Sequence, residues 1–409
     1  MLDQFYQDPL TLQRLRVGPL GPYIDAFAQQ LSTRGYAKWG GRQKIRAVSH
    51  LNHWLERRQR GVEDLDEQVV SAFLSRRCKG VPRRDAPPAL RMLLSLLRDA
   101  GSIRCAPVRE EGPRHAIEQR FAQYLTQVRG LAKPTIRNYL LITCAFLSER
   151  FHSEEVTLDE LTSRDITRFV VRHADRMSLR SAQLVTTALR SFFRFLYERG
   201  EISTNLAYSV PTVANWRFSN LPKFLEPKHV ERLLGSCDRS SPIGRRDYAV
   251  LLFLARLGLR AGEVVHMQLD DLDWERGEVM VRGKSLRYDR LPIPKDVGEA
   301  LAQYLCHRPR CSSRRVFLRS NAPRQGFAGS PTVCDIVRRA LVRAGLHPAH
   351  KGSHLLRHGL AVTMLRGGAS LAEIGEILRH ELPSTTEIYA KVDVAALRAL
   401  ALPWQGGEL

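Results

Sequence analysis

The sequence predicts a mainly α-helical protein with a small β-sheet, in which helical N-terminal domains precede a mixed α and β domain. Apolar residues recur at helical spacing along most of the 409-residue chain. Two charged, proline-bearing stretches, residues 104–115 and 206–227, interrupt this pattern. A single pair of strand-like segments follows the second interruption. One hydrophobic core rarely serves a chain of this length, so we expect several domains.

The two interruptions divide the chain into three predicted domains and a linker. Residues 1–105 form an additional helical domain, and residues 114–205 form a second one. Residues 206–226 are the predicted linker, and residues 227–409 form the mixed domain. Each helical domain is expected to be a compact unit of four helices.

The two helical domains resemble each other in sequence, which indicates an internal duplication. Phe27-Ala28-Gln29 aligns with Phe121-Ala122-Gln123 at an offset of 94 residues. The offset then increases as small loop insertions would make it, to 95 at Ala37-Lys38 and Ala132-Lys133, to 96 at Leu65/Leu161 and Phe73/Phe169, and to 99 at Arg91/Arg190, Gly101/Gly200 and Ile103/Ile202. The alternative is that any two amphipathic bundles align this well when gaps are allowed.

The net charge indicates a polyanionic partner. Lys and Arg number 63 against 42 Asp and Glu, which gives a formal charge of +21 at pH 7. A membrane is a poorer candidate because no apolar run approaches the roughly 18 residues of a spanning helix, and the first residues lack a signal-peptide core. A polyanion such as a nucleic acid is therefore the expected partner. Its candidate contacts in the helical domains are Arg34, Lys38, Arg42, Lys44, Arg46, Lys133 and Arg137.

The seven cysteines and the histidines give no indication of a metal site. No two cysteines form a CxxC pair, so reduced thiols in a cytoplasmic protein fit best. A histidine-rich run, His347, His350, His354 and His358, has no cysteine or carboxylate to complete a usual zinc ligand set. We expect neither a metal nor a cofactor.

The strand pair predicts a β-hairpin. The segments Glu278–Val281 and Arg290–Ile293 flank polar residues 282–289, which places Lys284 near the turn. Pro292 cannot donate a backbone hydrogen bond, which marks the second strand as an edge strand.

Helix signals locate the remaining polar residues. Residues Ser353–Arg366 are predicted to be helical, so His354 and Arg357, three residues apart, lie on one face. The four-residue runs that begin at Ser370 and Ser384 both have the S-x-x-E form of a capping box. His380 is accordingly expected at the end of one helix and Tyr389 early in the next.

The order and spacing of these residues resemble the tyrosine recombinase (integrase) family. The matching segments are Ala255–Glu263 with Arg260, His354-Leu355-Leu356-Arg357-His358, Leu378-Arg379-His380, and Ile388-Tyr389-Ala390, with Tyr389 nine residues after His380. Lys284 occupies the hairpin position of the family's catalytic lysine. Residues 227–409 match closely, residues 114–205 resemble the family's helical core-binding domain more loosely, and residues 1–105 fall outside the two-domain pattern of Xer-like members.

The resemblance implies the chemistry. Tyr389 attacks a DNA phosphodiester and forms a 3′-phosphotyrosyl bond, which a 5′-hydroxyl can reverse without ATP or metal. Arg260 and Arg357 neutralise the non-bridging oxygens because a guanidinium is always charged and binds two oxygens at once. The resemblance also implies roles for four other residues. His354 accepts the phenolic proton, Lys284 protonates the leaving 5′-oxygen, His380 donates a hydrogen bond, and Glu263 supports Arg260.

The biological task is less defined than the reaction. The additional N-terminal domain favours an integrase or transposase of a mobile element over an Xer-like resolvase of replicon dimers. A type IB topoisomerase uses a similar site, and a DNA-binding regulator with a decayed site is the non-enzymatic alternative. Recombination of two duplexes implies a tetramer on DNA, with the tail from Val392 to Leu402 as a candidate helix that docks on a neighbouring subunit. A nucleoid-associated location in the cytoplasm follows from DNA as the partner.

Overall fold

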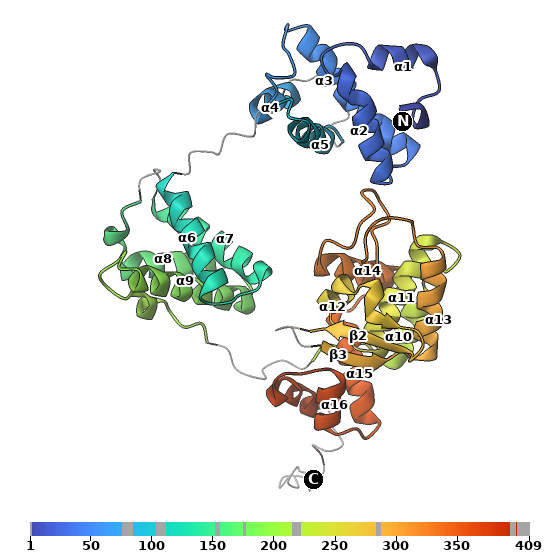
Figure 1. The fold of residues 1–409 in the computed structure, drawn as a ribbon. Coiled ribbons are helices and arrows are strands. Elements are labelled where there is room, and N and C mark those ends of the chain that lie inside the picture. The colour runs from blue at the N-terminus through green and yellow to red at the C-terminus, as the bar shows by residue number, and fades with distance from the viewer. Residues whose placement is uncertain are drawn as a thin grey trace. The chain divides into compact units, whose positions relative to one another are not determined.

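The computed structural model describes residues 2–75, 85–103, 112–151, 156–174, 177–214, 222–283, 288–392 and 398. Lys284 and most of the tail after Val392 lie outside these residues. The predicted fold class is confirmed, since helices dominate the described residues (Figure 1). The sheet among these residues has three antiparallel strands. Contacts between Cα atoms divide the chain into two compact units, residues 106–219 and residues 1–105 with 220–409.

Residues 2–103 have a hydrophobic core of their own. Its helices are η1 (Leu2–Gln4), α1 (Pro9–Leu15), α2 (Gly21–Thr33), α3 (Lys38–Glu56), α4 (Glu67–Ser75) and α5 (Ala86–Asp99). Apolar residues at helical spacing on α2, α3 and α5 face inward, and Phe27, Leu51 and Leu90 are fully buried. The four predicted helices correspond to α2–α5, and α1 precedes them.

Residues 113–210 form a second helical unit with a separate core, drawn as a bundle in Figure 1. Its helices are α6 (Pro113–Gln127), α7 (Lys133–Arg150), η2 (Leu158–Glu160), α8 (Ser163–Ala174), α9 (Leu179–Glu198) and η3 (Leu206–Ser209). Aromatic rings fill the core, with Phe121 edge-on to Phe192 at 5.1 Å between ring centroids. Leu206 and Val210 are buried in this core, so the first part of the predicted linker packs as part of this unit.

Residues 222–392 are mixed α and β. The elements are α10 (Pro227–Gly235), α11 (Pro242–Arg256), α12 (Ala261–His266), η4 (Leu269–Asp271), β1 (Leu272–Asp273), β2 (Glu278–Arg282), β3 (Tyr288–Pro292), α13 (Lys295–Cys306), α14 (Ser330–Arg343), α15 (His354–Arg366), α16 (Leu371–Ile377), η6 (Pro383–Thr385) and η7 (Glu387–Val392). Residues 249–255 of the central helix α11 are all apolar and buried, since this helix contacts α10, α13, α14 and α15.

The predicted hairpin is confirmed as β2 and β3, with Val279 opposite Leu291. The strand order β1-β2-β3 leaves β3 at an edge, as Pro292 indicated. The short strand β1 was not predicted, since its two residues are too few to show an alternating pattern.

The last elements form a small second core. Ala361 and Val362 of α15 pack with Ile374 of α16, with Leu378 and with Tyr389. The capping box at Ser370 is confirmed, since its hydroxyl accepts the Glu373 N–H at 3.2 Å. The prediction of a second capping box at Ser384 was wrong. Two short 3₁₀ segments, η6 and η7, take the place of that helix, and Tyr389 lies in η7.

In the part of the chain that the structure describes, no helix is long and apolar enough to cross a membrane.

Candidate active site

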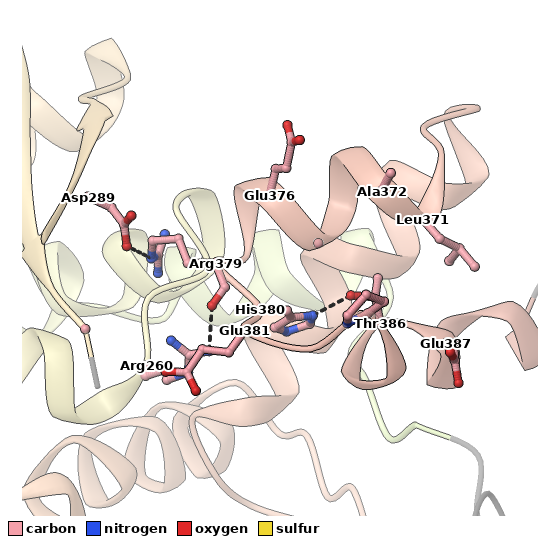
Figure 2. Close-up of a pocket in the computed structure, with 13 residues that line it drawn as sticks. Arg260, Asp289, Leu371, Ala372, Glu376, Arg379, His380, Glu381, Thr386 and Glu387 are labelled. Atoms are coloured by element: carbon pink, nitrogen blue, oxygen red, sulfur yellow. Dashed lines mark hydrogen bonds and ion pairs between the residues drawn. The ribbon is translucent and has the colours of Figure 1, made fainter. Parts of the chain in front are cut away.

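An open cavity of about 780 Å³ lies where α12, β3, α16 and the η6 and η7 segments meet (Figure 2). Its polar lining includes Arg260, Arg379, His380 and Thr386. Gly283, the last described residue before Lys284, lines the same cavity, as does Asp289 of β3. The cavity therefore unites segments that are up to 127 residues apart in the sequence. Its charged lining has both signs: Arg260 and Arg379 are cationic, and Asp289, Glu376, Glu381 and Glu387 are acidic.

Arg260 is held at the start of α12 by Glu263. The Glu263 carboxylate accepts the backbone N–H of Arg260 at 2.8 Å and pairs with the Arg260 guanidinium at 2.8 Å. A carboxylate three residues into a helix commonly caps its N-terminus in this way. The guanidinium of Arg260 also donates to the backbone carbonyl of Arg379 at 3.0 Å (Figure 2). Arg260 is still 35% exposed and can accept a ligand, whereas Glu263 is buried. The predicted support of Arg260 by Glu263 is present as a contact.

Arg357 of α15 is not among the residues that line the cavity; it is buried and connects two turns. Its guanidinium donates to the backbone carbonyls of Gly258 and Leu378, and only 3% of the residue is exposed. Residue 258 must be glycine, since its φ is +59° and a Cβ would lie 2.6 Å from the Leu378 side chain. Burial, with help from the charges of Arg260 and Arg379, lowers the pKa of Arg357 to about 10. Three arginine side chains and one buried carboxylate, Glu263, thus leave an excess of positive charge at this site, which favours an anionic ligand.

Tyr389 is fully buried, and its hydroxyl lies 2.7 Å from Nδ1 of His358. Burial raises the pKa of Tyr389 to about 12, although the Arg357 charge lowers it in part. Burial, followed by the neighbours His354 and Arg357, lowers the pKa of His358 to about 4. The phenol is therefore protonated and the imidazole is neutral near pH 7. The Tyr389 hydroxyl donates to Nδ1 of His358 in the tautomer that carries the ring proton on Nε2.

His380 stacks near Tyr389 and is oriented by Thr386. Its Nδ1 lies 2.7 Å from the Thr386 hydroxyl (Figure 2). Its ring is 9° from parallel to the Tyr389 ring, at 6.4 Å between centroids. Burial and the charges of Arg357 and Arg260 lower the pKa of His380 to about 4. His380 is therefore neutral at pH 7. It does not end α16 as predicted, since that helix stops at Ile377 and the chain turns at Arg379, whose φ is +54°.

The structure brings together most, but not all, of the described site residues that were expected from the sequence. Arg260, Arg357, His380 and Tyr389 are brought together with Glu263. His354 is exposed at the start of α15, and its ring centroid lies 6.0 Å from that of His358. The partner of the Tyr389 hydroxyl is His358.

Three residues at this site have no role predicted from the sequence: His358, Arg379 and Thr386. His358 directly follows Arg357 and lies one helical turn after His354, a spacing that places both histidines on one face of α15. Arg379 belongs to the family-like pattern only as a neighbour of His380. Nothing in the sequence distinguishes Thr386 as a site residue, because threonine hydroxyls are also common where they only cap a helix.

The candidate DNA contacts are exposed with one exception. Arg34, Lys38, Arg42, Arg46, Lys133 and Arg137 are all exposed. Lys44 contradicts its prediction: it is 5% exposed, pairs with Asp85 at 3.5 Å, and lies over the Tyr36 ring. Lys44 is therefore a core residue, because its position on α3 faces inward between Gly41 and Val48.

Among the described residues, no group of three or more histidine, cysteine, aspartate or glutamate side chains could hold a metal ion. The described histidines of the run that begins at His347 therefore do not form such a group with any neighbouring carboxylate or thiol.

Comparisons with known proteins agree with the site. Residues 223–395 match the phage integrase family, and residues 119–200 match the phage integrase N-terminal SAM-like domain. A putative integrase/recombinase of Sinorhizobium fredii, y4rA, is 45% identical to this chain over 406 residues. The match covers 98% of each of the two chains. The tyrosine recombinase XerD of Listeria innocua is 32% identical over 289 residues, which are 68% of this chain and 94% of XerD.

Solved structures share the fold. One is XerH bound to a palindromic difH substrate in a post-cleavage complex, with a TM-score of 0.53 and 20% identity over 70% of this chain and 84% of that chain. Another is a lambda integrase tetramer bound to a Holliday junction, with a TM-score of 0.52 and 18% identity over 76% of this chain and 87% of that chain.

A SAM-like helical unit followed by a catalytic part with this site defines an enzyme that cuts and rejoins DNA strands. The chain belongs to the phage integrase family, the tyrosine recombinases.

Proposed function

We propose that this protein is a site-specific recombinase of a mobile element and that Tyr389 is its nucleophile. The phenolic oxygen attacks the scissile phosphorus, a 3′-phosphotyrosyl bond forms, and the bond to the 5′-oxygen breaks. A 5′-hydroxyl of another strand then reverses the step on the same phosphorus, so the phosphodiester energy is conserved. The observation that carries the proposal is the placement of Tyr389 and His358 against Arg357, beside a cavity lined by Arg260 and His380.

The cationic groups suit a phosphodiester whose non-bridging oxygens gain charge in the transition state. Arg260 is exposed to the cavity, and Arg357 keeps further N–H donors after its two backbone bonds. His380 completes the set. When the Thr386 hydroxyl donates to Nδ1, the neutral ring carries its proton on Nε2, where it can donate to a phosphate oxygen.

The buried position of Tyr389 is a resting position in this scheme. A fully buried hydroxyl cannot meet a DNA backbone, so attack requires that the η7 segment move toward the cavity. The 3₁₀ form of η7 suits such a movement, because short 3₁₀ segments have poorer hydrogen-bond geometry than α-helices. The scissile phosphate then neutralises the arginine charge that lowers the pKa of His358, which makes this histidine a better proton acceptor.

We assign the phenolic proton to His358 in preference to His354, because Nδ1 of His358 lies 2.7 Å from the Tyr389 hydroxyl. Lys284 remains the proposed acid that protonates the leaving 5′-oxygen. Its support is the position of Gly283 and Asp289 in the cavity wall, on either side of the undescribed hairpin turn.

The DNA contacts and the assembly are part of the same proposal. Lys133 and Arg137, exposed at the start of α7, contact phosphates in the SAM-like unit. The active assembly is a tetramer on two duplexes, by analogy with the lambda integrase tetramer bound to a Holliday junction. The tail from Val392 to Leu402 docks on a neighbouring subunit, and the enzyme works at the nucleoid in the cytoplasm.

The test is a covalent complex. DNA-bound protein from cells that carry the wild type should contain a denaturation-resistant protein–DNA adduct, and Tyr389→Phe should bind DNA equally well without forming it. Sequencing of the trapped DNA separates the alternatives. A single recurring site with exchanged flanks supports a recombinase, scattered sites without exchange support a type IB topoisomerase, and no adduct in the wild type supports a binding protein. Recurring junctions between an element and its target support the mobile-element role over resolution of replicon dimers.

A further inference from the structure

Two features of the chain carry inferences of their own, and the first is the N-terminal unit. Residues 20–103 repeat the SAM-like unit helix by helix, with α2, α3, α4 and α5 in the places of α6, α7, α8 and α9. The match extends to individual buried positions of the last helix in each unit. Ala89, Leu90 and Leu97 are all fully buried, as are Ala188, Leu189 and Leu196, 99 residues later.

The ends of the helices repeat as well. Gly101 has a φ of +67° and Gly200 a φ of +68°. The backbone N–H of Ser102 donates to the Leu97 carbonyl at 2.9 Å, and the N–H of Glu201 donates to the Leu196 carbonyl at 2.9 Å. Each pair is the closing bond of the same helix-ending motif. The same bond closes other helices of this chain, such as the one from Leu346 to Leu341, so it agrees with a duplication, and the matched buried positions carry the inference.

The exposed basic edge at the start of the second helix is also duplicated. Arg34, Gly35, Lys38 and Arg42 on the first copy correspond to Arg129, Gly130, Lys133 and Arg137 on the second, at an offset of 95. Gly35 and Gly130 both have positive φ, +75° and +57°. All six cationic side chains of the two sets are exposed. The first copy adds Arg46, where the second has Leu141, which is 60% exposed.

We propose that residues 2–103 are a second SAM-like unit that binds DNA phosphates through Arg34, Lys38 and Arg46. Arg42 is partly committed, because its guanidinium donates to the Phe5 carbonyl and lies over the Tyr6 ring. The comparison with relatives agrees with a role for residues 2–103 that is separate from that of the catalytic part. XerD matches only 68% of this chain, whereas y4rA matches 98%. The inference rests on the proposed function only in that DNA is the ligand.

The experiment uses the full chain and a mixed-sequence duplex, so the target site need not be known. The test variant is Arg34→Ala/Lys38→Ala/Arg46→Ala. The matched control is Arg14→Ala/Arg57→Ala/Arg60→Ala, which removes the same charge from exposed positions of the same unit, with Arg57 and Arg60 beyond the opposite end of α3. The plot of log affinity against log salt should become shallower by roughly 0.9 per lost contact in the test variant and remain unchanged in the control.

Equal slopes in both triple variants and the wild type would overturn the inference, as would equal losses in both. The adduct assay with the same proteins separates this result from the proposed function. Equal salt slopes for the test and control variants would contradict the N-terminal DNA contact. Absence of the adduct in the wild type would contradict the recombinase proposal.

The second feature is Arg379, a charged residue in a strained and buried place. Its φ of +54° is in the left-handed region that favours glycine, and its side chain is only 7% exposed. Its guanidinium pairs with Glu263 at 2.9 Å, and its Nε lies 4.0 Å from Asp289, without a hydrogen-bond partner in the described chain. Figure 2 shows the Asp289 contact and the bond from Arg260 to the Arg379 carbonyl.

These contacts connect the two sides of the cavity. Glu263 pairs with both Arg260 and Arg379, so its carboxylate is shared by two guanidinium groups. Asp289 belongs to β3, the strand that follows the turn containing Lys284. A strained backbone conformation persists only where the surrounding contacts hold it. At Arg379 the side chain makes such contacts, with Glu263 and Asp289. We infer that Arg379 is a positioning residue that fixes the Arg260–Glu263 pair and the catalytic hairpin in register.

Arg379→Gly tests this role, since glycine removes the guanidinium and relieves the strained φ. The matched control is Gln59→Gly, at the other described non-glycine residue with a positive φ, +51°. Both variants should fold. Arg379→Gly should bind DNA normally but cleave at least tenfold more slowly, since a misplacement of about 1 Å can cost roughly 10²-fold. Arg379→Lys, which can still pair with Glu263, should recover part of the rate.

The rate loss should also be shared with Glu263. Arg379→Gly combined with Glu263→Gln should be little slower than the worse single variant, because both act through one carboxylate. Cleavage by Arg379→Gly at the wild-type rate, or fully additive losses, would overturn the inference. If Arg379→Gly fails to fold, Arg379→Gln takes its place with the same expected loss. This inference rests on the proposed function, and an adduct in the wild type establishes that function independently of any Arg379 variant.

Discussion

The hydroxyl of Tyr389 and Nδ1 of His358 lie 2.7 Å apart in the interior of the protein. The two groups have opposite pKa shifts, to about 12 for the phenol and to about 4 for the imidazole. Proton transfer between them is therefore unfavourable in the resting structure. In the proposed mechanism, Tyr389 stays protonated and buried until the scissile phosphate binds, which prevents cleavage outside an assembled complex.

The role of His358 can be measured by substitution. His358→Ala should slow strand cleavage by roughly 10² to 10⁴, the usual contribution of a proton-transfer residue. His358→Gln, which keeps a hydrogen-bond partner for Tyr389 but has no basic nitrogen, should be similarly slow. His354→Ala should lose less. A larger loss in His354→Ala than in His358→Ala would return the proton to His354.

The phosphate-binding arginines should differ in their effect on stability. Loss of one oxyanion donor costs roughly 10² to 10³ in rate, so Arg260→Ala and Arg357→Ala should both cleave slowly. Arg357→Ala should also melt at a lower temperature, because Arg357 is buried and holds two backbone carbonyls. Arg276→Ala, exposed beyond the cavity, is the control. Near-normal cleavage by either site variant would remove that arginine from the site.

Lys284 should be distinguishable from the other site residues by its substrate requirement. Lys284→Ala should be slow on ordinary DNA and fast on DNA with sulfur in place of the bridging 5′-oxygen, because a thiolate leaves without a proton. Arg260→Ala should stay slow on both substrates. If sulfur gives Lys284→Ala no advantage, Lys284 is not the acid.

The histidines also predict how stability depends on pH. The pKa values of His358 and His380 are lowered to about 4, whereas an unfolded histidine has a pKa of about 6.5. The unfolded chain therefore binds more protons between these values, and the stability present above about pH 6.5 is lost as the pH falls toward 4. The melting temperature of the wild type should fall more steeply from pH 7 to pH 5 than that of His358→Gln. Parallel curves would show that His358 is not buried in its neutral form.

Much of the site could be predicted from the sequence because several of its parts have local signals. The hairpin follows from alternating residues and from Pro292, and α15 follows from helical spacing, so the helix that carries Arg357 is evident from the sequence alone. The same spacing placed His354 and His358 on one face. It could not show which ring meets Tyr389, since that depends on how η7 packs against α15.

The failures have a common physical origin. The S-x-x-E run at Ser384 has a helix signal, but Pro383 and the burial of Tyr389 favour two 3₁₀ segments, so packing overrode the local pattern. Lys44 is cationic and lies among exposed cations, yet Asp85, distant in sequence, pairs with it in the core. Arg379 gave no signal because positive φ and ion pairs with Glu263 are features of the folded chain alone.

The central claim is that Tyr389 becomes covalently linked to DNA. A nicked substrate that loses its 5′-hydroxyl fragment after cleavage should trap the adduct, and digestion followed by mass spectrometry should identify the modified peptide. The proposed mechanism predicts a single modified residue, Tyr389, carrying a nucleotide 3′-phosphate. A nucleotide on any other tyrosine or serine, or one attached through its 5′-phosphate, would contradict it.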